Sequence, residues 1–325
     1  MLILDEDLRC DMPTKETIDW STERYRQMLI DQRRRMWRDD TLDCVISWLG
    51  VRSAMTVVDV GAGLGYLGRA FGPAIGNSGN YIGVDVSAKL LDEARRASAQ
   101  TSMGCNADFV CGNAGCIPIE SDSSDIVMCQ TLLMHLPEPE VALREMMRIA
   151  KPGGLLLCIE PDNLSVGISI GFQSVPRMSV DDQLGYMKLL LLSNKGRIKL
   201  GRGDHSVGAK VTLMMNDLGL KDVEARINDR VRLLLPPYDS AYQQDYFEMT
   251  KKRFFTDSDD ESSRKTAKEE FIAGGGTGSD FDSIYEMLKS RVKLYREQLE
   301  NRTFSSCSGY LLYIAKGRKP IGELD

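Results

Sequence analysis

Residues 57–66 of this chain read Val-Val-Asp-Val-Gly-Ala-Gly-Leu-Gly-Tyr, and this stretch decides the fold. It begins with β-branched apolar residues, which is the composition of a fully buried strand. It then passes one acid, Asp59, and has glycine at the alternate positions 61, 63 and 65. A helix-compatible segment follows from Leu67 to Phe71. A strand, a glycine turn and a helix in this order bring backbone N–H groups and a helix N-terminus to a nucleotide-like ligand.

Around this stretch, apolar strand-like runs alternate with helix-like segments. This alternation predicts an α/β fold in which crossover helices cover both faces of a parallel sheet. Ser87 is a suitable N-cap for the helix after the second strand, and Gly50 is well placed to end a helix before the first. The expected strands cover residues 56–60, 81–85, 108–111, 125–130, 155–160, 223–227 and 309–315.

Helical segments flank and interrupt this core. We expect N-terminal helices within residues 1–50, and a core in residues 51–235 with inserted helices from about 162, after a loop-like stretch at 162–178. Residues 236–304 are mostly helical, and residues 305–325 return as the last core strand and a tail. Ligands bind at the strand ends of open α/β sheets, so the N-terminal helices and the segments between 162 and 304 are expected to form a cap there.

The composition excludes several classes of function. The chain has 325 residues, of which 42% are hydrophobic, but no run of 18 apolar residues that would predict a membrane span. A formal net charge of −6 provides no overall basic field for nucleic acid. The eight cysteines form no CxxC pair and only two histidines occur, so we expect no metal site and a reducing, cytoplasmic location. A thiolate site built from Cys105, Cys111 and Cys116 is the alternative that their spacing leaves open.

The glycine turn is compatible with two cofactors, NAD and S-adenosylmethionine. The dinucleotide pattern GxGxxG requires glycine where this chain has Tyr66. Asp59, two residues before Gly61, would repel an anionic pyrophosphate but favours a ligand that carries an ammonium and a sulfonium. The turn therefore favours S-adenosylmethionine over NAD, while a turn that serves only chain reversal is the alternative without a ligand.

Polar residues also follow the next two expected strands. Asp85 ends the second strand, where a carboxylate can accept hydrogen bonds from both ribose hydroxyls. After the third strand, the Asn113 side chain can pair with an adenine amino group and the Ala114 N–H with a ring nitrogen. Each signal is common alone, because dehydrogenases use a similar acid and asparagine is frequent in turns.

Taken together, the motifs resemble the class I S-adenosylmethionine-dependent methyltransferases, especially the small-molecule branch similar to the ubiquinone/menaquinone C-methyltransferases. They occur in the family's order and at its spacings within about residues 40–160. The matching motifs are Val58–Gly65, Gly83–Ser87, Cys111–Ala114 with Ile117-Pro118, Asp125–Gln130, Leu133–Pro137 and Lys151–Leu155.

The resemblance implies a Rossmann-like seven-stranded sheet with an antiparallel last strand and a helical cap insertion. Two departures stand out: the family usually has aspartate at Asn113, and usually a short hairpin in place of residues 236–304. The implied cofactor residues are Asp59, Gly61, Ala62 and Gly63 around the methionine part, with Gly65 completing the turn, Asp85 and Val86 at the ribose and adenine face, Asn113 and Ala114 at the adenine edge, and Gln130 at the methionine carboxylate or amine.

Methyl transfer is an in-line displacement at a sulfonium carbon, so the protein mainly aligns the acceptor and excludes water. His135 and Glu160 are the candidate bases for an acceptor that must lose a proton; the alternatives are a structural turn for His135 and a loop salt bridge for Glu160. We expect a small-molecule acceptor, whose identity the sequence leaves open together with the oligomeric state. The alternative functions are a cofactor-binding regulator without transfer activity and an NAD-linked oxidoreductase.

Overall fold

The computed structural model describes residues 20, 22–168, 172–256, 261–309 and 311–322. These residues form two compact units, each built from separate stretches of the chain. Unit 1 comprises the described residues of Met1–Pro161, Val207–Asp229 and Leu312–Asp325, and unit 2 comprises those of Asp162–Ser206 and Arg230–Leu311.

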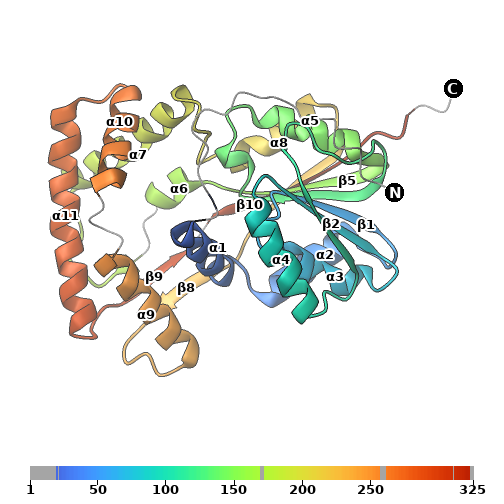
Figure 1. Cartoon of the computed structure of the whole chain (residues 1–325). Helices are drawn as coiled ribbons and strands as arrows, with labels where there is room; N and C mark the ends of the chain where they lie inside the picture. Colours follow the sequence, from blue (N-terminus) through green and yellow to red (C-terminus); the bar gives the residue numbers. More distant parts are fainter. Residues whose placement is uncertain (1–19, 21, 169–171, 257–260, 310, 323–325) are drawn as a thin grey trace. The chain divides into compact units, whose positions relative to one another are not determined.

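Unit 1 contains a seven-stranded sheet with the order β3-β2-β1-β4-β5-β10-β7 (Figure 1). Strands β1 to β5 pair in parallel, whereas β10 runs antiparallel between β5 and β7. This confirms the predicted fold class and the antiparallel last strand. The strands are β1 (Thr56–Val60), β2 (Asn80–Asp85), β3 (Asn106–Cys111), β4 (Ser124–Gln130), β5 (Ala150–Pro161), β7 (Lys221–Ile227) and β10 (Leu312–Arg318).

Helices cover both faces of this sheet. On one face, α5 and α8 pack onto the central strands in a buried cluster that includes Val58, Val127 and Leu156. On the other face, α3 packs directly on the ring of Tyr81. The contact is so close that a Cβ added to Gly68 of α3 would lie only 2.5 Å from that ring. The helices of unit 1 are α1 (Glu23–Met36), α2 (Asp39–Leu49), α3 (Tyr66–Ile75), α4 (Ala88–Gln100), α5 (Pro139–Ile149) and α8 (Gly208–Asp217), with a short 3₁₀ helix η1 (Leu133–His135).

Local signals in the sequence explain several of these boundaries. The Ser87 side chain accepts a hydrogen bond from the N–H of Leu90 and so caps α4. Gly50 ends α2 with a φ of 66°, a left-handed conformation that glycine adopts without steric strain. Every residue of β1 is buried, which is why three of its five residues are valines and only Thr56 and Asp59 are polar.

Unit 2 is largely helical and also contains a three-stranded sheet with the order β6-β9-β8. Helix α7 packs mainly on α10, and the two backbones touch at Gly196, where a Cβ would lie 1.7 Å from the carbonyl oxygen of Glu270. The elements of unit 2 are α6 (Asn163–Ile168), β6 (Phe172–Gln173), α7 (Val180–Lys199), β8 (Val231–Leu234), α9 (Ala241–Thr256), α10 (Glu261–Ala273), α11 (Gly278–Glu300) and β9 (Ser306–Gly309).

The structure differs from two local predictions. The stretch 162–178 was expected to be a loop, but α6 and β6 lie within it. The last strand was expected at 309–315, whereas β10 begins at Leu312 and a separate strand, β9, precedes it. Within the described ranges no helix is long and apolar enough to cross a membrane. The same ranges hold no group of three or more His, Cys, Asp or Glu side chains placed to bind a metal ion.

Candidate functional site

The expected cofactor residues lie at the carboxyl ends of neighbouring strands. Val60, the last residue of β1, is the register partner of Val84 in β2 and of Cys129 in β4. Asp85 is likewise the partner of Cys111, the last residue of β3. The glycine turn, Asp85, the Asn113 segment and Gln130 therefore follow strands that end side by side at one edge of the sheet.

The glycine turn uses backbone conformations that other residues rarely adopt. Gly61, Gly63 and Gly65 have φ angles of 75°, 52° and 69°. The N–H groups of Gly61 and Ala62 both donate to the carbonyl oxygen of Val84, at 2.7 and 3.0 Å. A Cβ at Gly65 would also lie 3.2 Å from the Phe109 ring, so this position is restricted by space as well as by φ.

Asp85 joins this turn to the start of α4. One oxygen of its carboxylate accepts a hydrogen bond from the N–H of Gly63 and the other from the N–H of Ser87, each at 2.8 Å. Burial raises the pKa of Asp85, and these N–H groups oppose that effect. A carboxylate has about four lone-pair sites, so each oxygen can still accept another donor. The next residue, Val86, is 63% exposed and presents an apolar surface beside this acid.

Asp59 lies within the sheet and is only 2% exposed. Its carboxylate accepts a 2.8 Å hydrogen bond from the hydroxyl of Tyr81. Burial, followed by the nearby Asp59 charge, raises the pKa of Tyr81 well above its ordinary value. Asp59 thus lies under the turn, and its predicted contact with a cofactor remains a prediction.

Asn113 closes a tight turn after β3. Its side-chain oxygen accepts a hydrogen bond from the N–H of Gly115 at 2.8 Å, and its carbonyl oxygen accepts one from Cys116 at 3.0 Å. An amide oxygen has two lone pairs, so the predicted bond from an adenine amino group would use the second.

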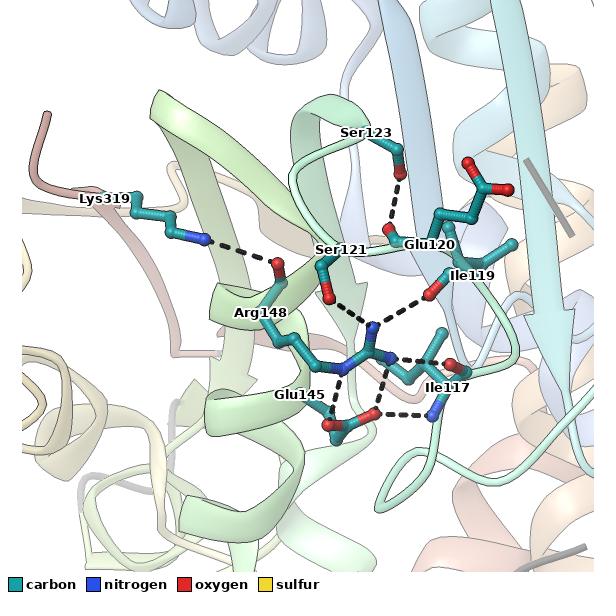
Figure 2. Close-up of polar contacts among 8 residues, drawn as sticks. All are labelled: Ile117, Ile119, Glu120, Ser121, Ser123, Glu145, Arg148 and Lys319. Carbon is teal, nitrogen blue, oxygen red and sulfur yellow. Dashed lines mark hydrogen bonds and ion pairs between the residues drawn. The ribbon is translucent and has the colours of Figure 1, made fainter. Parts of the chain in front are cut away.

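Two residues of α5 hold the segment that follows Asn113 (Figure 2). The guanidinium of Arg148 donates to the carbonyl oxygens of Ile117 and Ile119, at 2.8 and 2.9 Å. Glu145 accepts from the N–H of Ile117 at 2.8 Å and pairs with Arg148 at 2.8 Å. The guanidinium beside it keeps the pKa of Glu145 low despite partial burial, so the clamp stays charged.

The N-terminal helix α1 lies along the carboxyl edge of the sheet (Figure 1). Arg26 forms a 2.6 Å ion pair with Glu93 of α4. A Cβ added to Gly63 would lie 3.9 Å from a methyl group of Leu29, which is its one neighbour within 4 Å in the part of the chain that the structure describes. Just after α1, the indole N–H of Trp37 donates to the side-chain oxygen of Gln130 at 3.2 Å.

These contacts enclose Gln130, which is 2% exposed. Its amide nitrogen lies 3.5 Å from the sulfur of Met36. Gln130 therefore connects β4 to the end of α1, and its predicted contact with the methionine part of a cofactor remains a prediction.

Glu160 is fully buried at the carboxyl end of β5. Its carboxylate accepts hydrogen bonds from the N–H groups of Leu132, Leu133 and Met134, at 2.9, 2.8 and 3.3 Å. Burial raises the pKa of Glu160 to about 7, and these N–H groups limit the rise. Its partners are these three backbone N–H groups and, at 3.9 Å, the thiol of Cys129, none of which is a cation, so the alternative of a loop salt bridge does not describe it. Glu160 instead holds η1.

His135 is the last residue of η1 and is half-buried. The ring of Trp20 lies edge-on to its imidazole, with the ring centroids 4.7 Å apart. Glu160 therefore fixes the turn that presents His135. The predicted catalytic roles of both residues remain predictions.

Three further residues of this region were not predicted from the sequence. Tyr81 binds Asp59 and Trp37 binds Gln130, as described above. Asn228, directly after β7, accepts a hydrogen bond from the N–H of Leu312, while its buried amide nitrogen has no hydrogen-bond partner among the residues the structure describes. The polar hydroxyl of Tyr81 within a buried strand was a usable signal, whereas nothing local marks Asn228.

Comparison with known proteins places this arrangement in a family. A family model described as "Methyltransferase domain" matches residues 58–158. The ubiquinone/menaquinone biosynthesis C-methyltransferases UbiE of Hahella chejuensis and Citrobacter koseri are each 34% identical to this chain over 126 residues, 39% of this chain and 49% of theirs. The chain therefore spans about half the length of the curated relatives it matches.

Solved structures with a similar course of the chain include the YcgJ protein from Bacillus subtilis, with a TM-score of 0.48, 19% identity and coverage of 88% of this chain and 100% of that one. An S-adenosylmethionine-dependent methyltransferase from Aquifex aeolicus has a TM-score of 0.40, 20% identity and coverage of 60% and 82%. The family match falls on the strands and the turn that form the candidate site. The chain therefore carries a class I S-adenosylmethionine-dependent methyltransferase domain.

Proposed function

We propose that this protein transfers a methyl group from S-adenosylmethionine to a small-molecule acceptor. The observation that carries the proposal is the hydrogen bond between Asp85 and the N–H of Gly63, which joins the glycine turn to the end of β2. The space above Gly63 suits a ligand, because among the described residues a Cβ there would have only the methyl end of Leu29 within 4 Å. The residues present therefore fit the cofactor that the family implies.

In this proposal the cofactor is held by groups at three neighbouring strand ends. The lone pairs of Asp85 that remain free of Gly63 and Ser87 would accept the two ribose hydroxyls. The exposed side chain of Val86 would lie against the adenine ring. Asn113 and Ala114 would contact the adenine edge, in a segment that Arg148 keeps in place.

The bound cofactor supplies an electrophilic methyl group on a sulfonium. The residues of the chain then align the acceptor and keep water away, since the reaction needs no protein nucleophile. The contact between Trp37 and Gln130 closes the edge beside β4 and would exclude water there. For an acceptor that must lose a proton, His135 is the proposed base and Glu160 the residue that positions it.

The acceptor is bound, in our proposal, by groups outside the cofactor site. The buried amide nitrogen of Asn228, for which the described residues provide no partner, would donate a hydrogen bond to an oxygen of the acceptor. The curated relatives are C-methyltransferases of ubiquinone/menaquinone biosynthesis by name, but the family match ends at residue 158. The N-terminal helices and the segments between 162 and 304, which lie outside the match, remain the predicted determinants of acceptor choice.

The test is transfer of a labelled methyl group from S-adenosylmethionine into a metabolite extract, with products identified by mass spectrometry. Wild-type protein should label at least one small molecule, and Asp85→Ala should not. Asp92→Ala, which removes an exposed carboxylate of α4, is the matched control and should retain activity. Cofactor binding without any labelled product would favour the regulator, and binding of NAD in its place would favour the oxidoreductase.

A further inference from the structure

The side chain of Lys319, the residue directly after β10, reaches the C-terminal end of α5. Its ammonium donates to the carbonyl oxygens of Arg148 and Ala150, at 3.3 and 2.9 Å, and pairs with the carboxylate of Asp122 at 2.6 Å. An ammonium has three N–H donors, so these acceptors can use all of them. Only 18% of the side chain is exposed. Lys319 therefore lies where three separate segments of unit 1 meet.

One of these segments carries part of the candidate cofactor site. Residues 117–123, which connect the Asn113 turn to β4, lie outside the helices and strands. The guanidinium of Arg148 holds the first half of this stretch, as described above, and its carbonyl oxygen accepts the N–H of Asp122 at 3.0 Å. The ammonium of Lys319 approaches the same carbonyl oxygen (Figure 2). The far end of the stretch is therefore held jointly by α5 and by the residue that follows β10.

Asp122 makes the chain turn at this point. Its φ is 56°, a left-handed conformation that residues other than glycine rarely adopt. Its side chain is 54% exposed, and its one ion pair among the described residues is the pair with Lys319. The same ammonium faces the C-terminal end of α5, where the helix dipole favours a cation. Lys319 thus stabilises both the turn and its contact with α5.

We propose that Lys319 is a positioning residue of the cofactor site, an inference that rests on the proposed function. It fixes the end of residues 117–123, and this stretch fixes the turn of Asn113 and Ala114, which in that proposal contact the adenine edge. Without the ammonium, the clamp from α5 remains but the end of the stretch is released. Part of the protein then has a cofactor site that is not formed, which weakens the apparent affinity in proportion.

Calorimetric titration of the full chain with S-adenosylmethionine tests the proposal. Lys319→Met keeps the aliphatic part of the side chain and should weaken binding at least about 3-fold. Methyl transfer into the metabolite extract at saturating cofactor should stay within about 2-fold of wild type, because only binding is affected. Arg318→Met is the matched control. This neighbouring cation contacts Gly153 and Asp222 but not residues 117–123, so its variant should bind the cofactor like wild type.

A double-mutant cycle tests whether Lys319 acts through the turn. Asp122→Asn removes the ion pair at an exposed side chain, and asparagine tolerates the left-handed conformation. It should weaken cofactor binding in the wild-type background but have no further effect in Lys319→Met. An equal effect of Asp122→Asn in both backgrounds would show that the two residues act independently, and would overturn the proposal.

Hydrogen exchange of the ligand-free protein separates this proposal from the proposed function. Lys319→Met should speed exchange in residues 117–123, and Arg318→Met should not. Unchanged exchange in Lys319→Met, wild-type affinity in that variant, or an equal loss of affinity in Arg318→Met would each overturn the proposal. A wild-type protein that does not bind S-adenosylmethionine would overturn the proposed function and the role of Lys319 at its site, and faster exchange would then still show that Lys319 holds the stretch.

Discussion

The hydroxyl of Tyr81 donates a 2.8 Å hydrogen bond to the carboxylate of Asp59, and neither side chain is more than 2% exposed. Asp59 is the acid by which the sequence favours a cationic cofactor over an anionic one. Tyr81 fixes the orientation of that acid from the neighbouring strand. Asp85, by contrast, is the carboxylate that binds the turn itself, through Gly63.

Tyr81→Phe should lower the free energy of unfolding by about 2 kcal/mol, because it removes a hydrogen bond to a buried charged group. Denaturant unfolding measures this loss. Tyr313→Phe, at a half-buried tyrosine of β10, is the control and should change the stability by less than about 1 kcal/mol. Equal stability of Tyr81→Phe and wild type would mean that the hydrogen bond does not hold Asp59.

Two glycines with similar φ angles separate backbone strain from loss of the site. Gly50→Ala should cost about 1 kcal/mol through its φ of 66° alone, since no described residue lies within 4 Å of the new Cβ, and should leave cofactor binding unchanged. Gly65→Ala adds crowding against Phe109 and should weaken binding of S-adenosylmethionine at least about 10-fold. Calorimetric titration of both variants measures the difference, and equal affinities would contradict the role of the turn.

Arg148→Lys should destabilise the segment after Asn113, because a lysine cannot reproduce the forked hydrogen bonds to Ile117 and Ile119. We expect several-fold weaker binding of S-adenosylmethionine and faster hydrogen exchange in residues 117–121. Arg144→Lys changes an exposed arginine of the same helix and is the control. Unchanged exchange in Arg148→Lys would show that the segment keeps its conformation without the clamp.

Glu160 should make the protein less stable as the pH rises. Its pKa is about 7 in the folded state and about 4.5 in the unfolded state, so the folded state binds the extra proton between these values. The stabilisation is complete below pH 4.5 and is lost as the pH rises through 7; its size is on the order of 3 kcal/mol. Unfolding by denaturant at several pH values measures it.

Glu160→Gln should remove this pH dependence while keeping the bonds from Leu132 and Leu133, because its amide oxygen can still accept both. The stability of the variant relative to wild type should therefore increase between pH 5 and pH 8. Parallel stability curves for the two proteins would show that Glu160 does not titrate in this range.

The sequence predicted unit 1 well because its signals are local. Its central strands are buried on both faces and read as apolar runs, and the turn between β1 and α3 needs glycines that no other residue replaces. Unit 2 was less predictable. Strands β6, β8 and β9 have two to four residues each, which is too short for a periodic pattern to identify them.

The candidate site was predictable only where its residues belong to a short motif in the sequence. The turn and Asp85 follow directly from the motif and its spacing. The pairing of Trp37 with Gln130 joins residues 93 positions apart, and the three N–H groups bound to Glu160 belong to another strand end. Such contacts depend on the packing of separate elements, which no local pattern in the sequence records.

Calorimetric titration of the full chain with S-adenosylmethionine and, separately, with NAD tests the proposed function at its cofactor. We expect one binding site for S-adenosylmethionine and no binding of NAD. Asp85→Asn should weaken the binding at least about 10-fold. The new NH₂ group is a donor and would face the N–H of Gly63 or of Ser87, which is also a donor, and one of the two oxygens that would accept the ribose hydroxyls is lost. The proposal would be contradicted if folded wild-type protein binds NAD, or if it fails to bind S-adenosylmethionine. An Asp85→Asn variant with wild-type affinity would also contradict it.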